Sequence, residues 1–105
     1  MAVIKATDSD FAGILKSNQH VVVKYFADWC GNCRLFSPKF KRLSEDDHFT
    51  NVTFVDVNAE TSPEARKLAG VTNLPFFAVF KNGNLVDTVA ASKEEAVRTL
   101  IHKLV

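Results

Sequence analysis

The sequence predicts an α/β fold with a central mixed sheet of about five strands flanked by four helices. Segments patterned as strands and as helices follow one another in the order β-α-β-α-β-α-β-β-α. The early β-α-β units require parallel pairing, whereas the last two strands, joined by a short turn, require antiparallel pairing. No repeat, linker or low-complexity segment interrupts this pattern, so we expect a single domain over residues 1–105.

The first third of the chain predicts an edge strand, a helix and a central strand. The edge strand covers residues 3–6, and Thr7 is the expected N-cap of a helix that begins with acidic residues. Residues 21–27 are apolar on both alternating faces, as in a central parallel strand. The helix between these strands carries an apolar stripe formed by Phe11, Ile14 and Leu15.

The middle of the chain predicts two further helices around a second buried strand at residues 51–57. Pro38 falls inside the first helix and predicts a kink there. Ser62 is the expected N-cap of the next helix, with Pro63 at its first position and Gly70 as its C-terminal cap. The apolar stripe of the first of these helices consists of Cys33, Phe36, Phe40 and Leu43.

The last third predicts a hairpin and a closing helix. Asn82-Gly83 is a strong hairpin signal between strands at residues 76–80 and 85–90. Ser92 and Glu95 have the spacing of a capping box and should begin the last helix. One face of that helix holds Ala96, Val97, Leu100, Ile101 and Leu104.

The composition excludes several classes of protein. The formal net charge is +1 and the charges are mixed along the chain, which argues against nucleic-acid binding and against a polybasic membrane surface. No apolar run approaches the roughly 18 residues of a membrane span. The first residues lack a basic segment followed by a long apolar one, so we expect no secretory signal and a cytoplasmic protein.

Cys30 and Cys33 are the only cysteines, and they stand where a predicted strand gives way to a predicted helix. A sulfur at that junction faces free backbone N–H groups and the positive end of the helix dipole, which favour the thiolate of Cys30. Cys33 lies one turn later, with Cα atoms about 5–6 Å apart, within disulfide range. Cys30 could therefore attack a substrate disulfide, and Cys33 could resolve the mixed disulfide.

Two other interpretations of the cysteines are weaker. A zinc site needs about four ligands, and the chain has no second Cys-x-x-Cys pair. The three histidines, His20, His48 and His102, are scattered without ligand spacing, so we expect no metal. Inert core thiols are disfavoured because Gly31-Asn32 between the cysteines is typical of a helix start.

The motifs of this chain resemble, in order and spacing, those of the thioredoxin family. They are residues 25–33 around the cysteines, Pro38, and the segments 54–58, 71–75 and 80–83. The resemblance covers essentially the whole chain. It implies a thioredoxin fold and a monomeric reductase of protein disulfides with no bound cofactor, supplied with electrons from NADPH by thioredoxin reductase.

The resemblance also implies roles for residues around the cysteines. Pro75 matches a cis-proline opposite the active site, which would bring the backbone of Leu74 beside Cys30 for pairing with an extended substrate. Trp29 matches a tryptophan that contacts substrate, although ordinary core packing is the alternative for it. The predicted substrate-binding residues are Trp29, Gly31, Asn32, Leu74, Pro75 and Ala91.

The chain departs from the family pattern at four positions. Asn32 replaces the usual proline and adds a donor near Cys30, so we expect a somewhat weaker reductant. Lys24 stands where the family has a buried Asp, and Asp56 stands where it often has a Lys. Ala91 takes the place of a glycine and could narrow the groove.

The inverted charges suggest that Lys24 and Asp56 pair beneath the active site. Asp56, through a water if needed, would then transfer the proton of Cys33, and both residues are predicted to take part in catalysis. Alternatively, Lys24 extends to solvent and Asp56 is an ordinary surface acid.

Two other functions remain open from the sequence. Asn32 and Lys24 favour a thioredoxin-like oxidase or isomerase, which the lack of a secretory signal argues against. A non-catalytic binding module with the same fold would not require the thiols.

Overall fold

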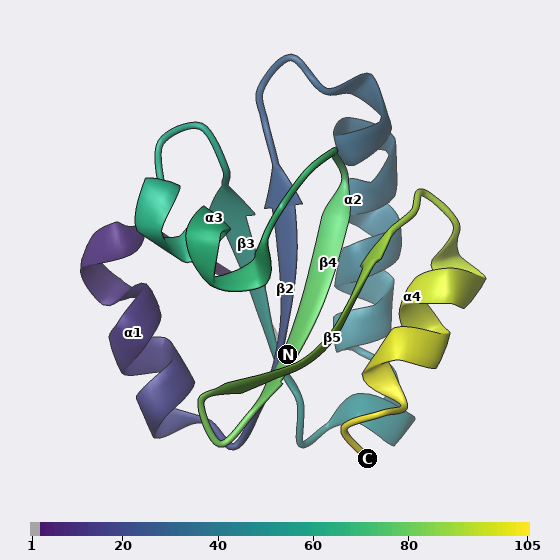
Figure 1. The fold of residues 1–105 in the computed structure, drawn as a ribbon. Coiled ribbons are helices and arrows are strands. Elements are labelled where there is room, and N and C mark those ends of the chain that lie inside the picture. The colour runs from purple at the N-terminus through teal and green to yellow at the C-terminus, as the bar shows by residue number, and fades with distance from the viewer. Residues whose placement is uncertain (1–2) are drawn as a thin grey trace.

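The computed structural model describes residues 3–105 and shows one mixed sheet between two layers of helices (Figure 1). The sheet has five strands in the order β1-β3-β2-β4-β5. The strands are β1 (Ile4–Ala6), β2 (His20–Phe26), β3 (Thr53–Asn58), β4 (Phe76–Lys81) and β5 (Asn84–Ala90). The helices are α1 (Asp8–Ser17), α2 (Gly31–Ser44), α3 (Pro63–Ala69) and α4 (Glu94–Ile101), with a short 3₁₀ helix η1 (Asp47–Phe49).

The pairing of the strands confirms the predicted mixed sheet. β1, β3 and β2 pair in parallel, and β2, β4 and β5 pair antiparallel. β1 lies at one edge and β2 at the centre, as their sequence patterns predict. In the parallel register, Lys24 of β2 stands beside Asp56 of β3, and Asp56 stands beside Lys5 of β1.

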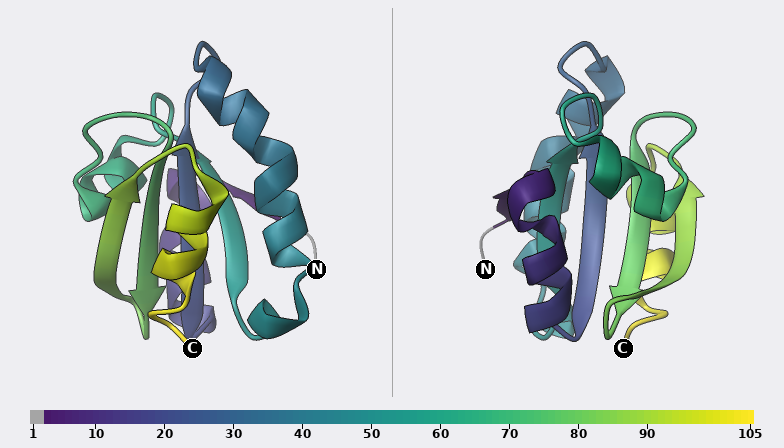
Figure 2. Two further views of the ribbon diagram at one scale, coloured as in Figure 1. Left: turned by 90° about the vertical axis from the view of Figure 1, so that its right-hand side faces the viewer. Right: turned by 60° about the vertical axis from the view of Figure 1, so that its left-hand side comes forward.

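The two faces of the sheet carry separate apolar clusters. α1 and α3 cover one face, and α2 and α4 cover the other (Figures 1 and 2). Alternate residues of β2 supply each cluster: Val23 packs toward α1 and α3, and Val22 packs toward α2 and α4. Because β2 is covered on both sides, its side chains are buried along nearly its whole length, and this includes Lys24.

Local signals account for most element ends. The backbone N–H of Thr7 donates to the Asp10 carboxylate (2.7 Å) at the start of α1. Gly70 ends α3 in the left-handed conformation, with φ 65°. Asn82 and Gly83 have φ of 54° and 82°, as the predicted two-residue hairpin turn requires.

The predicted capping box at the last helix is wrong. The N-cap of α4 is Lys93, whose backbone is extended, and Ser92 lies in the preceding loop. Acidic side chains support this helix end instead, since Glu94 lies in the first turn and accepts a hydrogen bond from Arg42 of α2 (3.0 Å).

The start of α3 agrees with the prediction only in part. Ser62 is the N-cap and Pro63 opens the helix, but the Ser62 hydroxyl makes no capping hydrogen bond. That oxygen is buried and has no hydrogen-bond partner within residues 3–105. No local pattern in the sequence predicts η1, whose Phe49 is buried against Phe54. Pro38 lies inside α2, where the kink stays a prediction.

Substituting Gly83 by alanine is expected to destabilise the protein by about 1–2 kcal/mol, the cost of the left-handed region for a residue with a Cβ. Gly83 has φ 82°, and a Cβ there would meet no atom within 4 Å, so the cost is one of backbone conformation alone. Gly13, inside α1, is the matched control, because its added Cβ also meets nothing. Gly13→Ala should stabilise by about 0.5–1 kcal/mol. Urea denaturation measures both, and equal effects would contradict the argument.

Candidate active site

The two cysteines lie at the start of α2, directly after the turn that follows β2. Cys30 is the N-cap of the helix, and its sulfur accepts a hydrogen bond from the backbone N–H of Cys33 (3.2 Å). The sulfur therefore occupies the place of a capping oxygen and faces the N–H groups of the first turn. This is the setting that the sequence predicts for a stabilised thiolate.

Cys30 and Cys33 form a disulfide, with Cα atoms 5.3 Å apart. Both cysteines are buried as residues, Cys30 at 5% and Cys33 at 2% exposure. They pack with Ala27, and the partly buried side chains of Phe26 and Leu74 contact this small cluster. The active-site sulfurs thus rest between the β2–α2 turn and the loop that precedes β4.

The loop before β4 brings predicted substrate-binding residues together around one small groove. The peptide bond between Leu74 and Pro75 is cis. A cavity of about 170 Å³ lies between this loop, the start of α2 and the loop after β5. Its lining includes four of the predicted residues, Asn32, Leu74, Pro75 and Ala91, together with Asn73, Ala90 and Ser92.

Trp29, next to Cys30 in the chain, lies at the surface and not in the core. It is 67% exposed, which excludes the core-packing alternative. Its indole N–H donates to the carboxylate of Glu60, in the loop after β3, at 2.8 Å. The ring is therefore held in place while its faces stay available for contact. Gly31 is exposed as the first residue of α2.

Lys24 and Asp56 form an ion pair beneath the cysteines, with Nζ 3.4 Å from Oδ1. Lys24 does not extend to solvent, since only 1% of the residue is exposed. Its ammonium also donates to the hydroxyl of Ser37 (2.7 Å) and lies over the rings of Phe26 and Phe40. The pairing expected from the inverted charges is present, and its catalytic role stays a prediction.

Ser37 connects this pair to the active-site helix. Its hydroxyl accepts from Lys24 and donates to the carbonyl oxygen of Cys33 (3.2 Å), one turn earlier on α2. The charge at the centre of β2 is thereby linked by hydrogen bonds to the backbone of the second cysteine. Substitutions at Lys24 should therefore affect the position of α2.

Burial dominates the electrostatics of this pair. Removal from water raises the pKa of the Asp56 carboxyl above its ordinary value, and the nearby ammonium of Lys24 opposes part of that rise. Burial likewise lowers the pKa of Lys24, with the Asp56 carboxylate acting in the opposite direction. A carboxyl with a raised pKa is suited to accepting and returning a proton near neutral pH.

A cavity of about 330 Å³ joins Asp56 to the second cysteine. Its lining includes Asp56, Lys24, Ser37 and Cys33, and it opens past the charged side chains of Lys5, Asp28 and Arg34. The volume is sufficient for several water molecules, and the walls are polar enough to hold them. Oδ1 of Asp56 accepts no hydrogen bond from the part of the chain that the structure describes.

Sequence reasoning missed Ser37, Glu60 and Lys5. Ser37 could have been found, because it follows Cys33 by one helical turn and so lies on the same face of α2. Lys5 could have been found from the parallel register, which places it beside Asp56. Glu60 lies in a loop whose course no local pattern predicts.

The structure shows neither a metal-binding cluster nor a membrane span within residues 3–105. No group of three or more His, Cys, Asp or Glu side chains in this range is placed to hold a metal ion. None of the helices described is both long and apolar enough to cross a bilayer.

Comparisons with known proteins agree with this site. The model of the Thioredoxin family matches residues 2–103. Thioredoxin 1 of Plasmodium falciparum is 32% identical over 103 residues, covering 98% of this chain and 97% of that protein. Among solved structures, P. falciparum thioredoxin superposes with a TM-score of 0.89 at 32% identity, covering 98% of this chain and all of that one (100%). The reduced thioredoxin pre-protein of Schistosoma mansoni gives 0.88 at 32% identity, with 100% of both chains covered.

Proposed function

This chain belongs to the thioredoxin family, and on that basis we propose how its residues carry out the thiol-disulfide exchange by which it reduces protein disulfides. One observation carries the proposal: the Cys30 sulfur caps α2 and is joined to Cys33 in a disulfide. A sulfur that accepts the N–H of its own helix is favoured as an anion, and therefore as the nucleophile. Residues 1–105 act as one catalytic domain.

The reaction uses two successive exchanges. In the reduced protein the Cys30 thiolate attacks one sulfur of the substrate disulfide, and the other substrate sulfur leaves as a thiolate. The Cys33 thiolate then attacks the Cys30 sulfur, which breaks the mixed disulfide and releases the second substrate thiolate. Two electrons pass from the protein dithiol to the substrate, and the product is the Cys30–Cys33 disulfide.

The groove beside the cis-proline holds the substrate during both exchanges. Leu74 offers its backbone to an extended substrate segment, and Pro75 presents a ring where a backbone donor would otherwise lie. Trp29, the residue before Cys30, supplies an exposed apolar face. Gly31, Asn32 and Ala91 complete the contact surface, with the methyl group of Ala91 limiting the width of the groove.

Asp56 is proposed to accept the proton of Cys33 through water in the cavity that they share. Lys24 keeps the carboxylate of Asp56 in position and favours the Cys33 thiolate electrostatically. Being buried and charged, Lys24 is a poor proton acceptor, so the proton goes to Asp56. Relative to the family pattern the two charges have exchanged positions, but the site retains both a base and a cation.

Asp56→Asn is expected to slow resolution of the mixed disulfide on the order of a hundredfold, the usual contribution of a general base, with little effect on the attack by Cys30. Only deprotonated Asp56 can act, so in the wild type the resolution rate rises with pH through its raised pKa. That rise should disappear in the variant. Stopped-flow kinetics with a fluorescent disulfide peptide separates the two steps.

The control for this variant is Asp28→Asn, which removes another carboxylate from the same cavity. It should leave the pH profile of resolution unchanged. Besides Asp56 and Asp28, the charged groups that line this cavity are Lys5 on β1, Lys24 on β2 and Arg34 on α2, and none of them is altered in either variant. Equal slowing of attack and resolution by Asp56→Asn would contradict the role as a base.

The electron source and setting are proposed from the family. A thioredoxin reductase would reduce Cys30–Cys33 at the expense of NADPH, and no cofactor would be bound by this chain. Two cysteines that must return to the dithiol state suit a reducing compartment such as the cytoplasm. We propose a monomer, because both thiols of the reaction come from one chain.

Insulin reduction tests the function. The protein should precipitate insulin chains when dithiothreitol is the reductant, and again with NADPH and a thioredoxin reductase. Failure with both reductants would overturn the assignment. Activity with dithiothreitol alone would retain the chemistry and reject the electron source.

Asn32 supports a second candidate, a thioredoxin-like oxidase or isomerase, because it lies at the groove beside Cys30 in place of a proline. A redox titration against glutathione decides between the two. A potential as negative as that of a Cys-Gly-Pro-Cys thioredoxin would remove the second candidate, whereas a clearly less negative one would favour it.

A further inference from the structure

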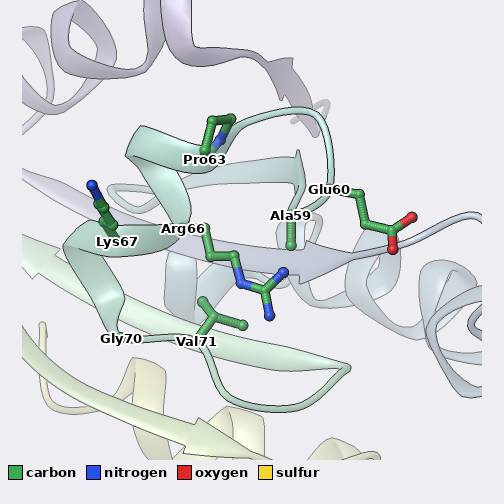
Figure 3. Close-up of a pocket in the computed structure, with 7 residues that line it drawn as sticks. All are labelled: Ala59, Glu60, Pro63, Arg66, Lys67, Gly70 and Val71. Carbon is green, nitrogen blue, oxygen red and sulfur yellow. The ribbon is translucent and has the colours of Figure 1, made fainter.

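A pocket larger than both cavities described above lies beside α3, and its lining includes Glu60, the partner of Trp29. It has a volume of about 630 Å³ and is formed by α3 and the loops at its two ends (Figure 3). Its lining comprises Ala59, Glu60, Pro63, Arg66, Lys67, Gly70 and Val71. The disulfide exchange proposed above does not use this pocket.

The pocket adjoins the active site through two segments. Glu60 holds the indole of Trp29, the residue next to Cys30, by a hydrogen bond of 2.8 Å. Val71 begins the loop that leads to Leu74, whose side chain contacts the cluster around the disulfide. A polypeptide that pairs with Leu74 and passes over Trp29 would therefore place residues near its own cysteine at this pocket.

Arg66 is the cation whose side chain reaches into the pocket (Figure 3). It is half-buried, and its guanidinium extends across the pocket between Ala59 and Val71 (Figure 3). Glu60 also lines the pocket, but its carboxylate points away from Arg66 and is engaged by Trp29 (Figure 3). Within residues 3–105 no carboxylate forms an ion pair with Arg66.

The chemistry of this arrangement identifies its ligand. A guanidinium presents a planar fork of donors that matches a carboxylate, and partial burial strengthens such a pair relative to one in water. The adjacent walls are apolar, at Ala59, Pro63 and Val71, and suit the methylene groups of an acidic side chain. Lys67 adds positive charge at the rim, whereas its side chain points away from the pocket centre (Figure 3).

We propose that Arg66 is a specificity residue that binds a glutamate or aspartate side chain of the substrate protein, a few residues from the cysteine that Cys30 attacks. The inference rests on the disulfide reductase function proposed above. It adds a preference for one class of substrate, namely disulfides flanked by acidic residues. Arg66 itself takes no part in the exchange of sulfur atoms.

The test uses homodimeric peptides joined by one disulfide, so that attack on either sulfur is equivalent. In one series a single glutamate is moved through the four positions on each side of the cysteine, and in the second series glutamine replaces it. The measured quantity is kcat/KM for reduction by the dithiol protein. At the favoured position the wild type should prefer glutamate by about fivefold, typical of a partly exposed ion pair, and the preference should shrink in high salt.

Two variants separate a specific contact from general attraction. Arg66→Gln should abolish the preference for glutamate without changing kcat/KM for the glutamine peptide. Lys67→Gln removes the same charge from the same helix and should preserve most of the preference. Equal loss in both variants would show diffuse attraction and overturn the proposal.

The remaining outcomes are also decisive. Reduction of all peptides at one rate by the wild type would reject the acidic subsite while leaving the reductase function intact. Failure to reduce any peptide, together with failure to reduce insulin, would reject the function itself. Thermal unfolding of Arg66→Gln and Lys67→Gln confirms that both variants are folded.

Discussion

Replacing Cys33 by serine is expected to stop turnover and leave the protein covalently joined to its substrate. Cys30 can still attack, but without the second sulfur the mixed disulfide waits for an external thiol. The rate of insulin reduction should fall at least about a thousandfold, as when one member of a catalytic unit is lost. Mass spectrometry after mixing with a disulfide peptide should show the adduct.

Cys30→Ser serves as the counterpart of this variant. It should be equally inactive in the insulin assay and should form no adduct, because the nucleophile at the N-cap is absent. A hydroxyl can still accept the N–H of Cys33, so the fold of α2 should be retained. An adduct through Cys33 in this variant would exchange the roles of the two cysteines.

Replacing Lys24 by methionine is expected to lower the free energy of unfolding by about 3–5 kcal/mol, because it leaves the carboxylate of Asp56 without its partner in the interior. The side chains of Lys24 and Asp56 are 2% and 16% exposed, so solvent screens this pair weakly. Urea denaturation at pH 7 provides the measurement.

The double variant Lys24→Met with Asp56→Asn should recover most of this stability, since the charge and its partner are removed together. If the effects of the two single substitutions on the free energy of unfolding simply added up in the double variant, the two groups would not interact. Asp56→Asn alone is measured as well, so that the two single variants and the double variant complete a double-mutant cycle.

The pH dependence of Lys24→Met has a defined sign. Burial raises the pKa of Asp56 in the folded protein, and removing Lys24 removes an influence that opposed the rise. A group with a raised folded pKa favours folding below its unfolded pKa and loses that contribution as pH rises through the folded pKa. The difference in free energy of unfolding between the wild type and the variant should therefore be smaller near pH 4 than at pH 7.

The succession of elements and the mixed pairing of the sheet followed from the sequence because strong local signals agreed with the burial pattern. The apolar run of β2, buried on both faces, and the Asn82-Gly83 turn indicate the central strand and the hairpin without reference to the rest of the fold. The last helix shows where this fails. Ser92 and Glu95 have capping-box spacing, but the N-cap is Lys93, and an ion pair between Glu94 and Arg42 of α2 supports the helix end.

The candidate site was predictable where chemistry and spacing coincide, at Cys30 and Cys33. The ion pair of Lys24 and Asp56 was predictable from the exchange of charge between two positions. Ser37 and Glu60 required coordinates, because each acts through a side-chain contact that crosses between elements. The same holds for Arg66, since only its position across the pocket distinguishes it from a surface arginine.

The separation of the two apolar clusters has a consequence for how such a protein can diversify. α2, which carries the thiols, is anchored with α4 on one face of the sheet, and α3, which carries Arg66, packs with α1 on the other. Residues on α3 can therefore change without repacking the layer that positions the sulfurs. Selection on the residues of α3 and selection on the packing of α2 can proceed on opposite sides of one sheet.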